Sequence, residues 1–403
     1  MTVKITKSRA SGTVSAPPSK SYAHRMMLCA ALSGGVSVVH GIGESEDMAA
    51  TLDCISTLGV RYEKIGNSVA FYGNERKTAE NAVFSCRESG STLRFMIPVA
   101  LALSDNAVFT GTKRLLERGI GEYEKILPQC GISIEKTDDI ITLRGRLRSG
   151  RYTVDGAVSS QFVTGLLFAL PLCDGDSEIE VTPPVESRPY IDITLDVLAK
   201  YGIKVEEKEN NTFEIRGGQS YRSADAAVEG DWSNAAFLYA LNTVGGDVTV
   251  VGLNENSVQG DKVFLTLAEK LDSPSPVIDL SDCPDLAPVL FALAAFKNGA
   301  RFTGTRRLRI KESDRAAVMA EELYKFGVQV DVGENEVVVH GGELHAPSEP
   351  LDSHNDHRIA MALSVLSTVT GGEIRGAEAV RKSYPDFFDV LASLGIKTET
   401  TND

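Results

Sequence analysis

The chain has 403 residues, of which 42% are hydrophobic and 24% charged, a composition typical of a globular protein long enough for two cored domains. Its formal net charge of −14 argues against nucleic acid or an anionic membrane as a general partner, because both require a broad basic face. Small anionic ligands remain compatible with it, since a lysine about 4 Å from a phosphate contributes on the order of 4 kcal/mol at an effective dielectric of about 20.

The N-terminus and the cysteines indicate the compartment. Met1-Thr-Val-Lys-Ile alternates like a β-strand and has neither an apolar signal core nor a transit-peptide composition. No apolar run approaches the roughly 18 residues of a membrane span. The six cysteines are dispersed without a CxxC pair, as is typical of reduced core residues. We therefore expect a cytoplasmic protein.

An apolar segment of helical length recurs six times along the chain. Each copy opens near a polar residue of the capping type and then becomes almost wholly apolar, which predicts buried helices. The segments are 19–33, 91–103, 159–172, 231–244, 282–296 and 354–369, and the expected caps are Ser19, Ser91, Ser159, Asp231, Asp282 and Asn355. This self-similarity indicates a repeated architecture.

Glycine-led strands fill the intervals between these helices. A strand, a short polar turn and a second strand are predicted after Gly59, Gly131, Gly202 and Gly327, and a single strand after Gly245, Gly299 and Gly371. The repeating unit is therefore a βαβαββ-like module, present six times. We expect the fifth copy to lack a clear strand pair and to be shortened near 271–279.

Six modules over this length predict an α/β fold with three modules in each of two domains. Candidate boundaries are 217–229 and 10–18, where Pro17-Pro18 interrupts the pattern. If the capped helix starts of both halves point toward a cleft between them, their partial positive charges would converge there.

The most charged of these starts is Leu308-Arg-Ile-Lys-Glu-Ser-Asp-Arg315. If this segment opens the helix read through 316–326, Lys311 and Arg315 share a face beside Glu312, and Ser313 can cap the first turn. Such a start is an anion site with a possible proton donor. For an isolated copy, a solvated and charged first turn is the favoured explanation, so the interpretation depends on similar groups elsewhere in the chain.

Such groups occur at most of the other starts. Several arginines and lysines at converging ends suit substrates with more than one phosphate or carboxylate, because guanidinium pairs with such oxyanions in bidentate fashion. Asp285 and Glu312 could serve as base and acid, with Lys311 and Arg315 holding Glu312 ionised until bound anions offset them. Arg94, inside an apolar helix, requires either a structural partner such as Glu88 or an anionic ligand.

Other chemistries have little support in the sequence. His354-x-x-His357 resembles half of a metal site, but no further clustered ligands accompany it, so we expect no metal. The chain has no GxxxxGK[ST] motif, no GxGxxG after a predicted strand and no GxSxG motif.

Eight motifs, in order along the chain, resemble those of the EPSP synthase (3-phosphoshikimate 1-carboxyvinyltransferase) family. They are Ser19-Lys-Ser-Tyr-Ala-His-Arg25, Ser89-Gly-Ser-Thr-Leu-Arg94, Glu117-Arg-Gly-Ile-Gly121, Ser159-Ser-Gln-Phe162, Ser187-Arg-Pro-Tyr-Ile-Asp192, Leu308–Arg315 as above, Asn355-Asp-His-Arg358 and Lys382-Ser-Tyr-Pro-Asp386. The resemblance implies the enolpyruvyl transferase fold, a two-domain inside-out α/β barrel. The first domain would comprise 1–13 and 226–403 and the second 14–225, with the active site in the interdomain cleft.

The resemblance also implies the reaction and the residues that serve it. The enolpyruvyl group of phosphoenolpyruvate would pass to the 5-hydroxyl of shikimate 3-phosphate without a metal or an organic cofactor. We expect the protein to be a monomer. Phosphoenolpyruvate would be held by Lys20, Gly90, Arg118, Gln161, Arg315, Arg358 and Lys382. Shikimate 3-phosphate would be held by Lys20, Ser21, Arg25, Ser159, Ser160, Gln161, Ser187, Tyr190, Asp285 and Lys311. The catalytic set would be Asp285 as base and Glu312 as acid, with Lys20, His357 and Lys382 supporting charge and proton transfer.

Four positions depart from the family's usual residues, namely Glu88, Phe95, Gly119 and Arg307. The family is the target of glyphosate, which competes with phosphoenolpyruvate. We expect this chain to be sensitive to it, because Gly90 leaves space beside the phosphoenolpyruvate pocket.

The sequence leaves three alternative functions open. The first is the sister enzyme that enolpyruvylates UDP-N-acetylglucosamine; it typically has Lys-Asn in the first motif and a reactive cysteine in the loop that corresponds to 112–121, whereas this chain has Ser21 and no cysteine there. The second is a non-catalytic anion-binding homologue, which would not need Asp285 and Glu312. The third is a repeat protein that binds partners on its faces.

Overall fold

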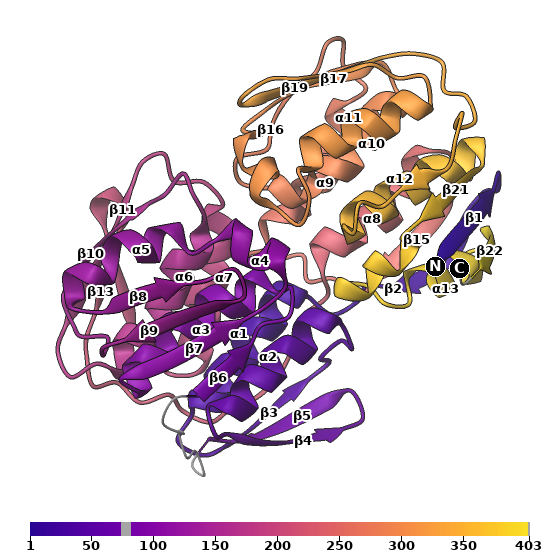
Figure 1. Ribbon diagram of the computed structural model, residues 1–403. Helices are drawn as coiled ribbons and strands as arrows, with labels where there is room; N and C mark the ends of the chain where they lie inside the picture. Colours follow the sequence, from indigo (N-terminus) through magenta and orange to yellow (C-terminus); the bar gives the residue numbers. More distant parts are fainter. Residues whose placement is uncertain (74–81, 402–403) are drawn as a thin grey trace. The chain divides into compact units, whose positions relative to one another are not determined.

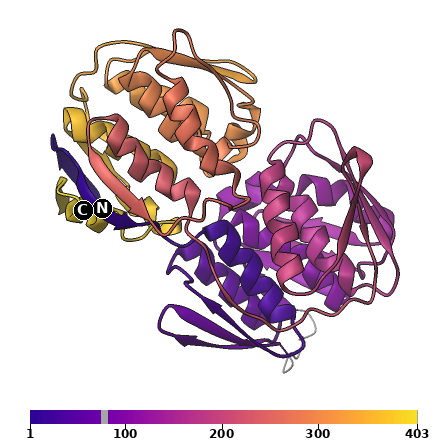
Figure 2. The same ribbon diagram turned by 180° about the vertical axis from the view of Figure 1, so that it is seen from behind.

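The structure is a computed structural model in which residues 1–73 and 82–401 are described (Figure 1). The chain forms two compact units, one of Met1–Ser19 with Gly230–Asp403 and the other of Lys20–Glu229. It passes from the first unit to the second after Ser19 and returns after Glu229. Figure 2 shows the same helices and sheets from behind.

The described residues of the unit Lys20–Glu229 form three four-stranded sheets of one design. Their strand orders are β14-β3-β5-β4, β6-β7-β9-β8 and β10-β11-β13-β12. In each sheet the first two strands are parallel and the remaining pairings are antiparallel. The strands are β3 (Val36–His40), β4 (Arg61–Ile65), β5 (Ser68–Tyr72), β6 (Ala82–Ser85), β7 (Asn106–Thr110), β8 (Ser133–Lys136), β9 (Ile140–Arg144), β10 (Arg151–Asp155), β11 (Ser177–Thr182), β12 (Val205–Lys208), β13 (Thr212–Ile215) and β14 (Asp225–Ala227).

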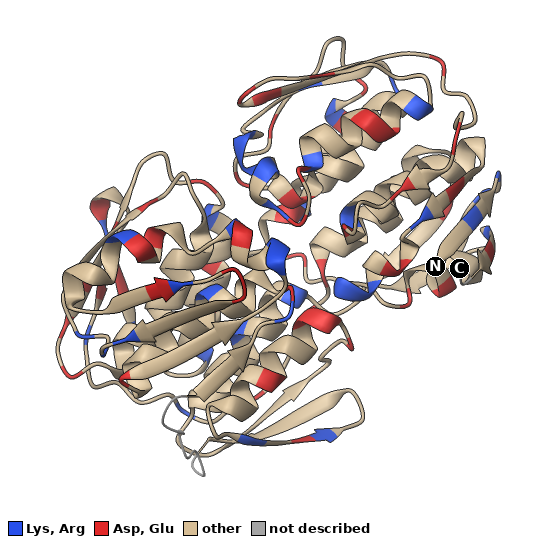
Figure 3. Cartoon of the chain, viewed as in Figure 1, with Lys and Arg blue, Asp and Glu red and all other residues tan. Residues whose placement is uncertain are grey.

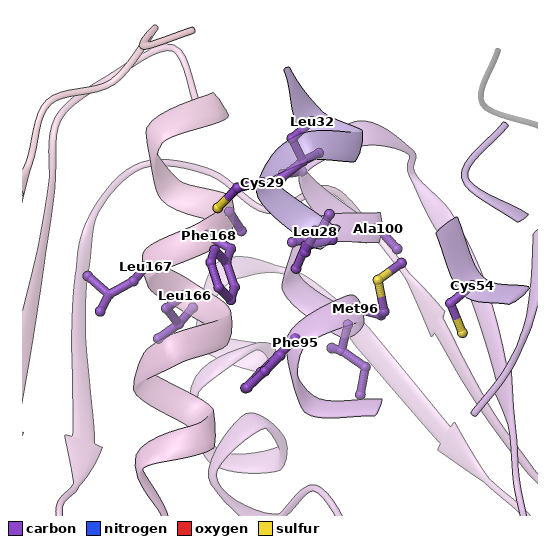
Figure 4. Packing of buried hydrophobic residues seen from close by; sticks show 14 of the residues in the cluster. Leu28, Cys29, Leu32, Cys54, Phe95, Met96, Ala100, Leu166, Leu167 and Phe168 are labelled. Atoms are coloured by element: carbon purple, nitrogen blue, oxygen red, sulfur yellow. The ribbon is translucent and has the colours of Figure 1, made fainter. Parts of the chain in front are cut away.

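Helices connect these strands and carry the core of the unit. They are α1 (Lys20–Leu32), α2 (Glu46–Thr57), α3 (Gly90–Leu103), α4 (Lys113–Arg118), α5 (Gly121–Ile126), α6 (Ser160–Ala169) and α7 (Arg188–Lys200). Figure 4 shows Leu28, Phe95 and Phe168 converging between α1, α3 and α6, and the rings of Phe95 and Phe168 lie edge to face with centroids 5.6 Å apart. The apolar helices are thus surrounded by other elements, as their sequences predict.

The unit Met1–Ser19 with Gly230–Asp403 contains two sheets of the same design and a shorter one. The strand orders are β20-β21-β1-β22, β16-β17-β19-β18 and β15-β2. The strands are β1 (Thr2–Thr6), β2 (Ser11–Ser15), β15 (Asp247–Val251), β16 (Val277–Asp279), β17 (Gly299–Thr303), β18 (Val330–Val332), β19 (Glu336–His340), β20 (Leu351–Asp352), β21 (Gly372–Arg375) and β22 (Lys397–Thr401). The N-terminal strand β1 pairs with both β21 and β22, so it completes the last module of the chain.

The helices of this unit are α8 (Trp232–Thr243), α9 (Phe264–Lys270), α10 (Ala287–Phe296), α11 (Arg315–Lys325), α12 (His357–Thr370) and α13 (Phe387–Ser393). Helix α10 contains no charged residue, and neither does α6. Figure 3 marks in blue and red where the Lys, Arg, Asp and Glu residues lie along the rest of the chain. Among the described residues no helix combines the length and the apolar character needed to cross a membrane.

The sequence placed the shortened module wrongly. The fifth apolar helix, α10, is followed by a full strand pair, β18 and β19. It is the fourth, α8, whose module is short, because β15 and α9 lead directly into β16. The shortening that we expected near 271–279 therefore belongs to the fourth module and not to the fifth.

Three of the expected helix caps are also wrong. Helix α3 is capped by Ser89 and not Ser91, and α12 is capped by Asp356 because Asn355 has a left-handed φ of 55°. Helix α10 begins only at Ala287, after a 3₁₀ turn opened by Pro284, so Asp282 lies too far upstream. Ser159 and Asp231 do cap α6 and α8, each accepting a backbone N–H.

Candidate active-site residues

The starts of α3 and α6 meet the end of α4 in the unit Lys20–Glu229. Arg94 donates to the side-chain oxygen of Gln161 at 2.5 Å, and Gln161 donates to Ser91 at 3.0 Å. Arg94 also donates to the carbonyl oxygens of Arg118 and Gly119 at 3.3 and 3.2 Å. The structure therefore brings Gln161 and Arg118 together around a buried guanidinium.

Gly90 is a close-packed position in the same cluster. A Cβ atom at Gly90 would lie 2.9 Å from a terminal nitrogen of the Arg118 side chain. The space that the sequence assigned to Gly90 is thus used by Arg118, and a larger residue would have to displace that guanidinium. Gly119, the C-cap of α4, has a φ of 68°, a left-handed conformation that favours glycine.

Arg25 joins α1 to α7 through neutral groups. It is 3% exposed and donates to the Thr194 hydroxyl at 2.8 Å and to the carbonyl oxygens of Ser21 and Tyr190 at 2.9 and 3.0 Å. Burial lowers the pKa of Arg25 to about 10. Ser187, buried at the start of α7, adopts a left-handed φ of 57°. Ser21, Arg25, Ser187 and Tyr190 therefore lie along the α1–α7 pair.

Lys20 and a buried histidine extend this cluster toward α2. Lys20 forms an ion pair of 3.0 Å with Asp47. His24 contacts the Thr51 hydroxyl at 2.7 Å, and Thr51 contacts Thr92 of α3 at 2.8 Å. Burial, reinforced by the charges of Lys20 and Arg25, holds the pKa of His24 well below its usual value, so the imidazole is neutral.

In the unit Met1–Ser19 with Gly230–Asp403, Asp285 is the centre of a charge cluster. One carboxylate oxygen accepts from Lys311 at 3.0 Å and from Arg315 at 2.9 Å, and the other accepts from Arg358 at 3.0 Å. Burial opposes ionisation of Asp285, but the three cations outweigh it and hold its pKa well below the usual value. The carboxylate is therefore ionised and weakly basic in this arrangement.

Arg315 is the buried cation that links Asp285 to two further carboxylates. It is 1% exposed, and its guanidinium donates to Glu312 at 2.7 Å and to Asp356 at 2.8 Å. Asp356 is itself fully buried and also accepts from the Ser313 hydroxyl at 3.1 Å. Burial works against the charge of Arg315, but the three carboxylates outweigh it and raise the pKa.

The expected common helical face for Lys311 and Arg315 is wrong. Helix α11 begins at Arg315 with Asp314 as its cap, and Lys311 ends a preceding 3₁₀ turn, Arg306–Ile310. The two cations meet through Asp285 and not through helical spacing. Ser313 does not cap the helix, since its hydroxyl is directed to Asp356.

Lys382 and His357 lie beside the loop that precedes α12. Lys382 is 7% exposed and donates to the carbonyl oxygen of Asn355 at 2.6 Å. His357 is 1% exposed, and its Nδ1 lies 3.9 Å from Asp356. His357 is therefore next to Asp356 in the sequence, and Lys382 reaches the same loop through its hydrogen bond to Asn355.

Among the described residues, His354 and His357 do not fall in one group of potential metal ligands. The one group of three potential ligands among the described residues consists of Glu321, Glu322 and His354, without His357. In that group Glu322 is already paired with Lys325 at 2.9 Å.

Sequence reasoning did not select several residues of these clusters. Asp47, which pairs with Lys20, and Asp356, which binds Arg315, looked like ordinary helix-start acids. Asp261 is 5% exposed, and burial together with the charge of Asp285 raises its pKa to about 6. The only signal was a carboxylate close to a capping position, which is too common to identify a partner far along the chain.

The departures from the family pattern have mostly structural roles. Phe95 belongs to the core and packs against Phe168. Arg307 is 6% exposed and donates to the carbonyl oxygen of Ser281 at 2.8 Å. Glu88 lies near the Thr112 hydroxyl, at 3.5 Å.

Comparison with solved structures defines the class of fold. The chain superposes on EPSP synthase from Acinetobacter baumannii with a TM-score of 0.81 and 24% identity, covering 100% of both chains. It superposes on the enolpyruvyl transferase NikO from Streptomyces tendae with a TM-score of 0.79 and 16% identity, covering 100% of this chain and 99% of the other. The fold is therefore that of the enolpyruvyl transferases, as the motifs predicted.

Sequence comparison identifies the family within that class. A family model described as EPSP synthase (3-phosphoshikimate 1-carboxyvinyltransferase) matches residues 5–391. Two relatives named 3-phosphoshikimate 1-carboxyvinyltransferase are 42% identical, from Clostridium kluyveri, and 37% identical, from Clostridium novyi; each alignment covers 98% of this chain and 97% of the relative. The chain belongs to the EPSP synthase family, and the resemblance seen in its motifs is confirmed.

Proposed function

We propose that this protein transfers the enolpyruvyl group of phosphoenolpyruvate to the 5-hydroxyl of shikimate 3-phosphate, giving 5-enolpyruvylshikimate 3-phosphate and inorganic phosphate. The step belongs to the shikimate pathway, which leads to chorismate and the aromatic amino acids. Membership of the EPSP synthase family supports the reaction. The observation that carries the mechanism is the Asp285 carboxylate held by Lys311, Arg315 and Arg358 beside Glu312.

The substrate-binding assignments follow the chemistry of each cluster. We assign to phosphoenolpyruvate the residues Lys20, Gly90, Arg118, Gln161, Arg315, Arg358 and Lys382. Most of them are cations, and Gly90 lets the backbone approach the ligand closely. We assign shikimate 3-phosphate to Lys20, Ser21, Arg25, Ser159, Ser160, Gln161, Ser187, Tyr190, Asp285 and Lys311. Guanidinium and ammonium groups suit the phosphates and the carboxylates, and hydroxyls suit the ring.

Anion binding would convert Asp285 from a paired carboxylate into a base. Its three cations now depress its basicity, as its low pKa indicates. When substrate phosphates and carboxylates attract Lys311, Arg315 and Arg358, their effect on Asp285 falls and its pKa rises. A base that strengthens only when the anions are bound favours reaction in the complete complex.

The proposed chemistry is an addition followed by an elimination. The oxygen of the 5-hydroxyl bonds to C2 of phosphoenolpyruvate while Asp285 accepts the hydroxyl proton. Glu312 donates a proton to C3, which becomes a methyl group, and the product of this step is a tetrahedral intermediate. The bond from C2 to the phosphate oxygen then breaks, and the ionised Glu312 takes a proton back from the methyl group as the new enol ether forms. Phosphate leaves with the proton that Asp285 accepted in the first step. Lys20, His357 and Lys382 support the developing charges and the proton transfers.

Phosphate release from phosphoenolpyruvate, with and without shikimate 3-phosphate, tests this function. We expect release only with both substrates, and a fall of at least about a hundredfold in kcat for Glu312→Gln, which removes the acid but keeps the shape. Release that does not depend on shikimate 3-phosphate would contradict a transfer reaction. Calorimetric binding of both substrates without any phosphate release would instead support a non-catalytic anion-binding homologue.

The remaining features of the proposal concern the setting of the enzyme. We propose a monomer that requires neither metal nor organic cofactor and has no nucleic acid or membrane partner. We propose the cytoplasm as its location, consistent with the free cysteines of the structure. Sizing chromatography of the purified chain tests the monomer.

A further inference from the structure

Two buried glutamates lie outside the residues assigned to the substrates. Glu122 of α5 is 3% exposed and Glu322 of α11 is 0% exposed. Burying a carboxylate is costly unless it is paired and hydrogen-bonded. Each glutamate therefore depends on the particular donors that surround it.

The two glutamates accept from the same two kinds of donor. Glu122 accepts from Lys125, three residues later, at 2.5 Å, and from the backbone N–H of Asp155 at 3.0 Å. Glu322 accepts from Lys325, also three residues later, at 2.9 Å, and from the backbone N–H of Asp352 at 3.0 Å. In both cases the last α-helix of one module is joined to the end of the first strand of the next module.

The loops that follow these strands are built alike. The side chain of Asp155 accepts the N–H of Ala157 at 2.9 Å, and that of Asp352 accepts the N–H of His354 at 2.6 Å. These are Asx turns, which fix the direction of the chain after the strand. One of these two loops lies in each compact unit.

Each of these loops ends in a helix cap of the same form. The cap lies four residues after the aspartate, at Ser159 in one unit and at Asp356 in the other. Ser159 accepts the N–H of Gln161 at 3.3 Å, and Asp356 accepts the N–H of Arg358 at 3.0 Å. The glutamates thus anchor the two loops that lead directly into assigned substrate-binding residues.

We propose that Glu122 and Glu322 are positioning residues, Glu122 for the shikimate 3-phosphate side of the site and Glu322 for the phosphoenolpyruvate side. This inference rests on the proposed function. The loop held by Glu122 carries Ser159, Ser160 and Gln161, and the loop held by Glu322 carries Arg358 and the Asp356 partner of Arg315.

The donors around Glu322 favour this role over cation binding. Glu321, Glu322 and His354 place one ligand atom each within 4.8 Å of one another. However, the oxygen of Glu322 that faces His354 at 2.9 Å also accepts from the ammonium group of Lys325 at 2.9 Å. The ammonium group of Lys325 would repel a cation bound by Glu321, Glu322 and His354. The same ammonium group stabilises the negative charge of Glu322, which favours the hydrogen bond that Glu322 accepts from the backbone N–H of Asp352.

The experiment compares Glu322→Gln and Glu122→Gln in the full-length chain. Glutamine has the same shape, but its single oxygen can serve only one of the two donors, and its NH2 group must then face an ammonium or an N–H. Glu321→Gln and Glu124→Gln are the matched controls, because both are exposed neighbours on the same helices. If Glu322→Gln does not fold, Glu322→Asp replaces it, since it keeps the charge but shortens the side chain.

We expect the two variants to affect different substrates. Glu322→Gln should raise the KM for phosphoenolpyruvate by about tenfold, and Glu122→Gln should raise the KM for shikimate 3-phosphate by a similar factor, because small misplacements of binding groups are costly. In Glu322→Gln the KM for shikimate 3-phosphate should change by less than about twofold. In Glu122→Gln the KM for phosphoenolpyruvate should rise by clearly less than the KM for shikimate 3-phosphate, because Gln161 is the one residue of that loop assigned to both substrates. The controls should match the wild type. A merely structural role would not separate the substrates.

Amide hydrogen exchange gives a second measurement that does not depend on activity. The N–H of Asp352 should exchange faster in Glu322→Gln, and that of Asp155 faster in Glu122→Gln, with the other site unchanged. Equal changes in both KM values, or unchanged KM values in folded variants of an active enzyme, would overturn the inference. Absence of phosphate release by the wild type would instead contradict the proposed function.

Discussion

Arg315 is buried with Asp285, Glu312 and Asp356. Its charge therefore depends on one nearby carboxylate, Glu312, and on two from distant parts of the chain. Of these, Asp356 is the one that is fully buried. A buried ion pair adds little to the free energy of unfolding compared with an apolar pair of the same size. Removing one partner of the ion pair is costly, however, because it leaves a buried charge without compensation. The cluster is therefore sensitive to the loss of any one carboxylate.

Asp356→Asn tests this dependence. Asparagine retains the helix-capping ability of aspartate, so the substitution removes mainly the negative charge beside Arg315. We expect a loss of about 3 kcal/mol in the free energy of unfolding, measured with denaturant, because a buried cation loses a partner. Asp314→Asn is the control, since Asp314 caps α11 but is not buried. Equal, small losses for both variants would contradict the role given to Asp356.

Gly90→Ala tests the packing of Arg118. The new methyl group would meet the guanidinium at 2.9 Å, a distance that requires the side chain to move. We expect the KM for phosphoenolpyruvate to rise several-fold while the KM for shikimate 3-phosphate stays nearly unchanged, as steady-state kinetics would show. Unchanged kinetics would mean that Arg118 does not hold phosphoenolpyruvate in this position.

Glyphosate provides a related test at the same residue. We expect it to inhibit the wild type in competition with phosphoenolpyruvate and to inhibit Gly90→Ala less, because displacement of Arg118 alters the shared pocket. The measurement is the inhibition constant of each variant. Full wild-type activity in glyphosate well above the phosphoenolpyruvate concentration would refute the expected sensitivity.

At the scale of elements, the loop 352–356 couples the end of β20 to the start of α12. Its His354 lies 2.9 Å from Glu322. The hydrogen bond to Glu322 is the largest influence on the pKa of His354 and raises it above the usual value, although burial opposes the shift. The protonated form of His354 is therefore the one that the folded loop favours.

The pH dependence of stability follows from the direction of this shift. Because the folded-state pKa is raised, the contribution of His354 is fully present below its unfolded value of about 6.5 and is lost as the pH rises through the folded-state value. The measurement is the free energy of unfolding of the wild type minus that of His354→Asn, from about pH 5.5 to 8.5. The difference should shrink as the pH rises; a difference that grows would contradict the assignment.

The elements also show which features the sequence could predict. The apolar helices and the glycine-led strand pairs follow from local periodicity, and α3, α6 and α8 appear where that periodicity places them. The caps were harder because several polar residues compete at each start, and the choice of Ser89 over Ser91 depends on an extended backbone at Ser89. Asp282 failed as a cap because the 3₁₀ turn at Pro284 delays the helix.

The partners of the site residues could not be predicted from local patterns. Arg94 and Gln161 are 67 residues apart, and Arg315 and Asp356 are 41 apart. Motif order indicated which residues matter and their charges suggested anions, but the pairing of three cations on Asp285 depends on how modules pack. The same limitation hid Glu122 and Glu322, which look like ordinary helical glutamates.

At the scale of the whole molecule, each compact unit is built from several copies of the same module. Each unit also carries one group of the residues that we assign to the substrates and to catalysis. The unit Lys20–Glu229 holds Lys20, Arg25, Arg118 and Gln161, and the other unit holds Asp285, Glu312, Arg315 and Arg358. The proposed reaction requires both groups, because neither unit alone supplies both the acid–base pair and all the anion-binding residues.

Phosphorus NMR of the wild-type reaction tests the central claim most directly, since it resolves phosphoenolpyruvate, shikimate 3-phosphate, its product and inorganic phosphate in one spectrum. The account predicts that one phosphate appears for each shikimate 3-phosphate converted, and that no phosphate appears when either substrate is omitted. Phosphate formed without conversion of shikimate 3-phosphate, or both substrates left unchanged with the folded protein, would contradict it.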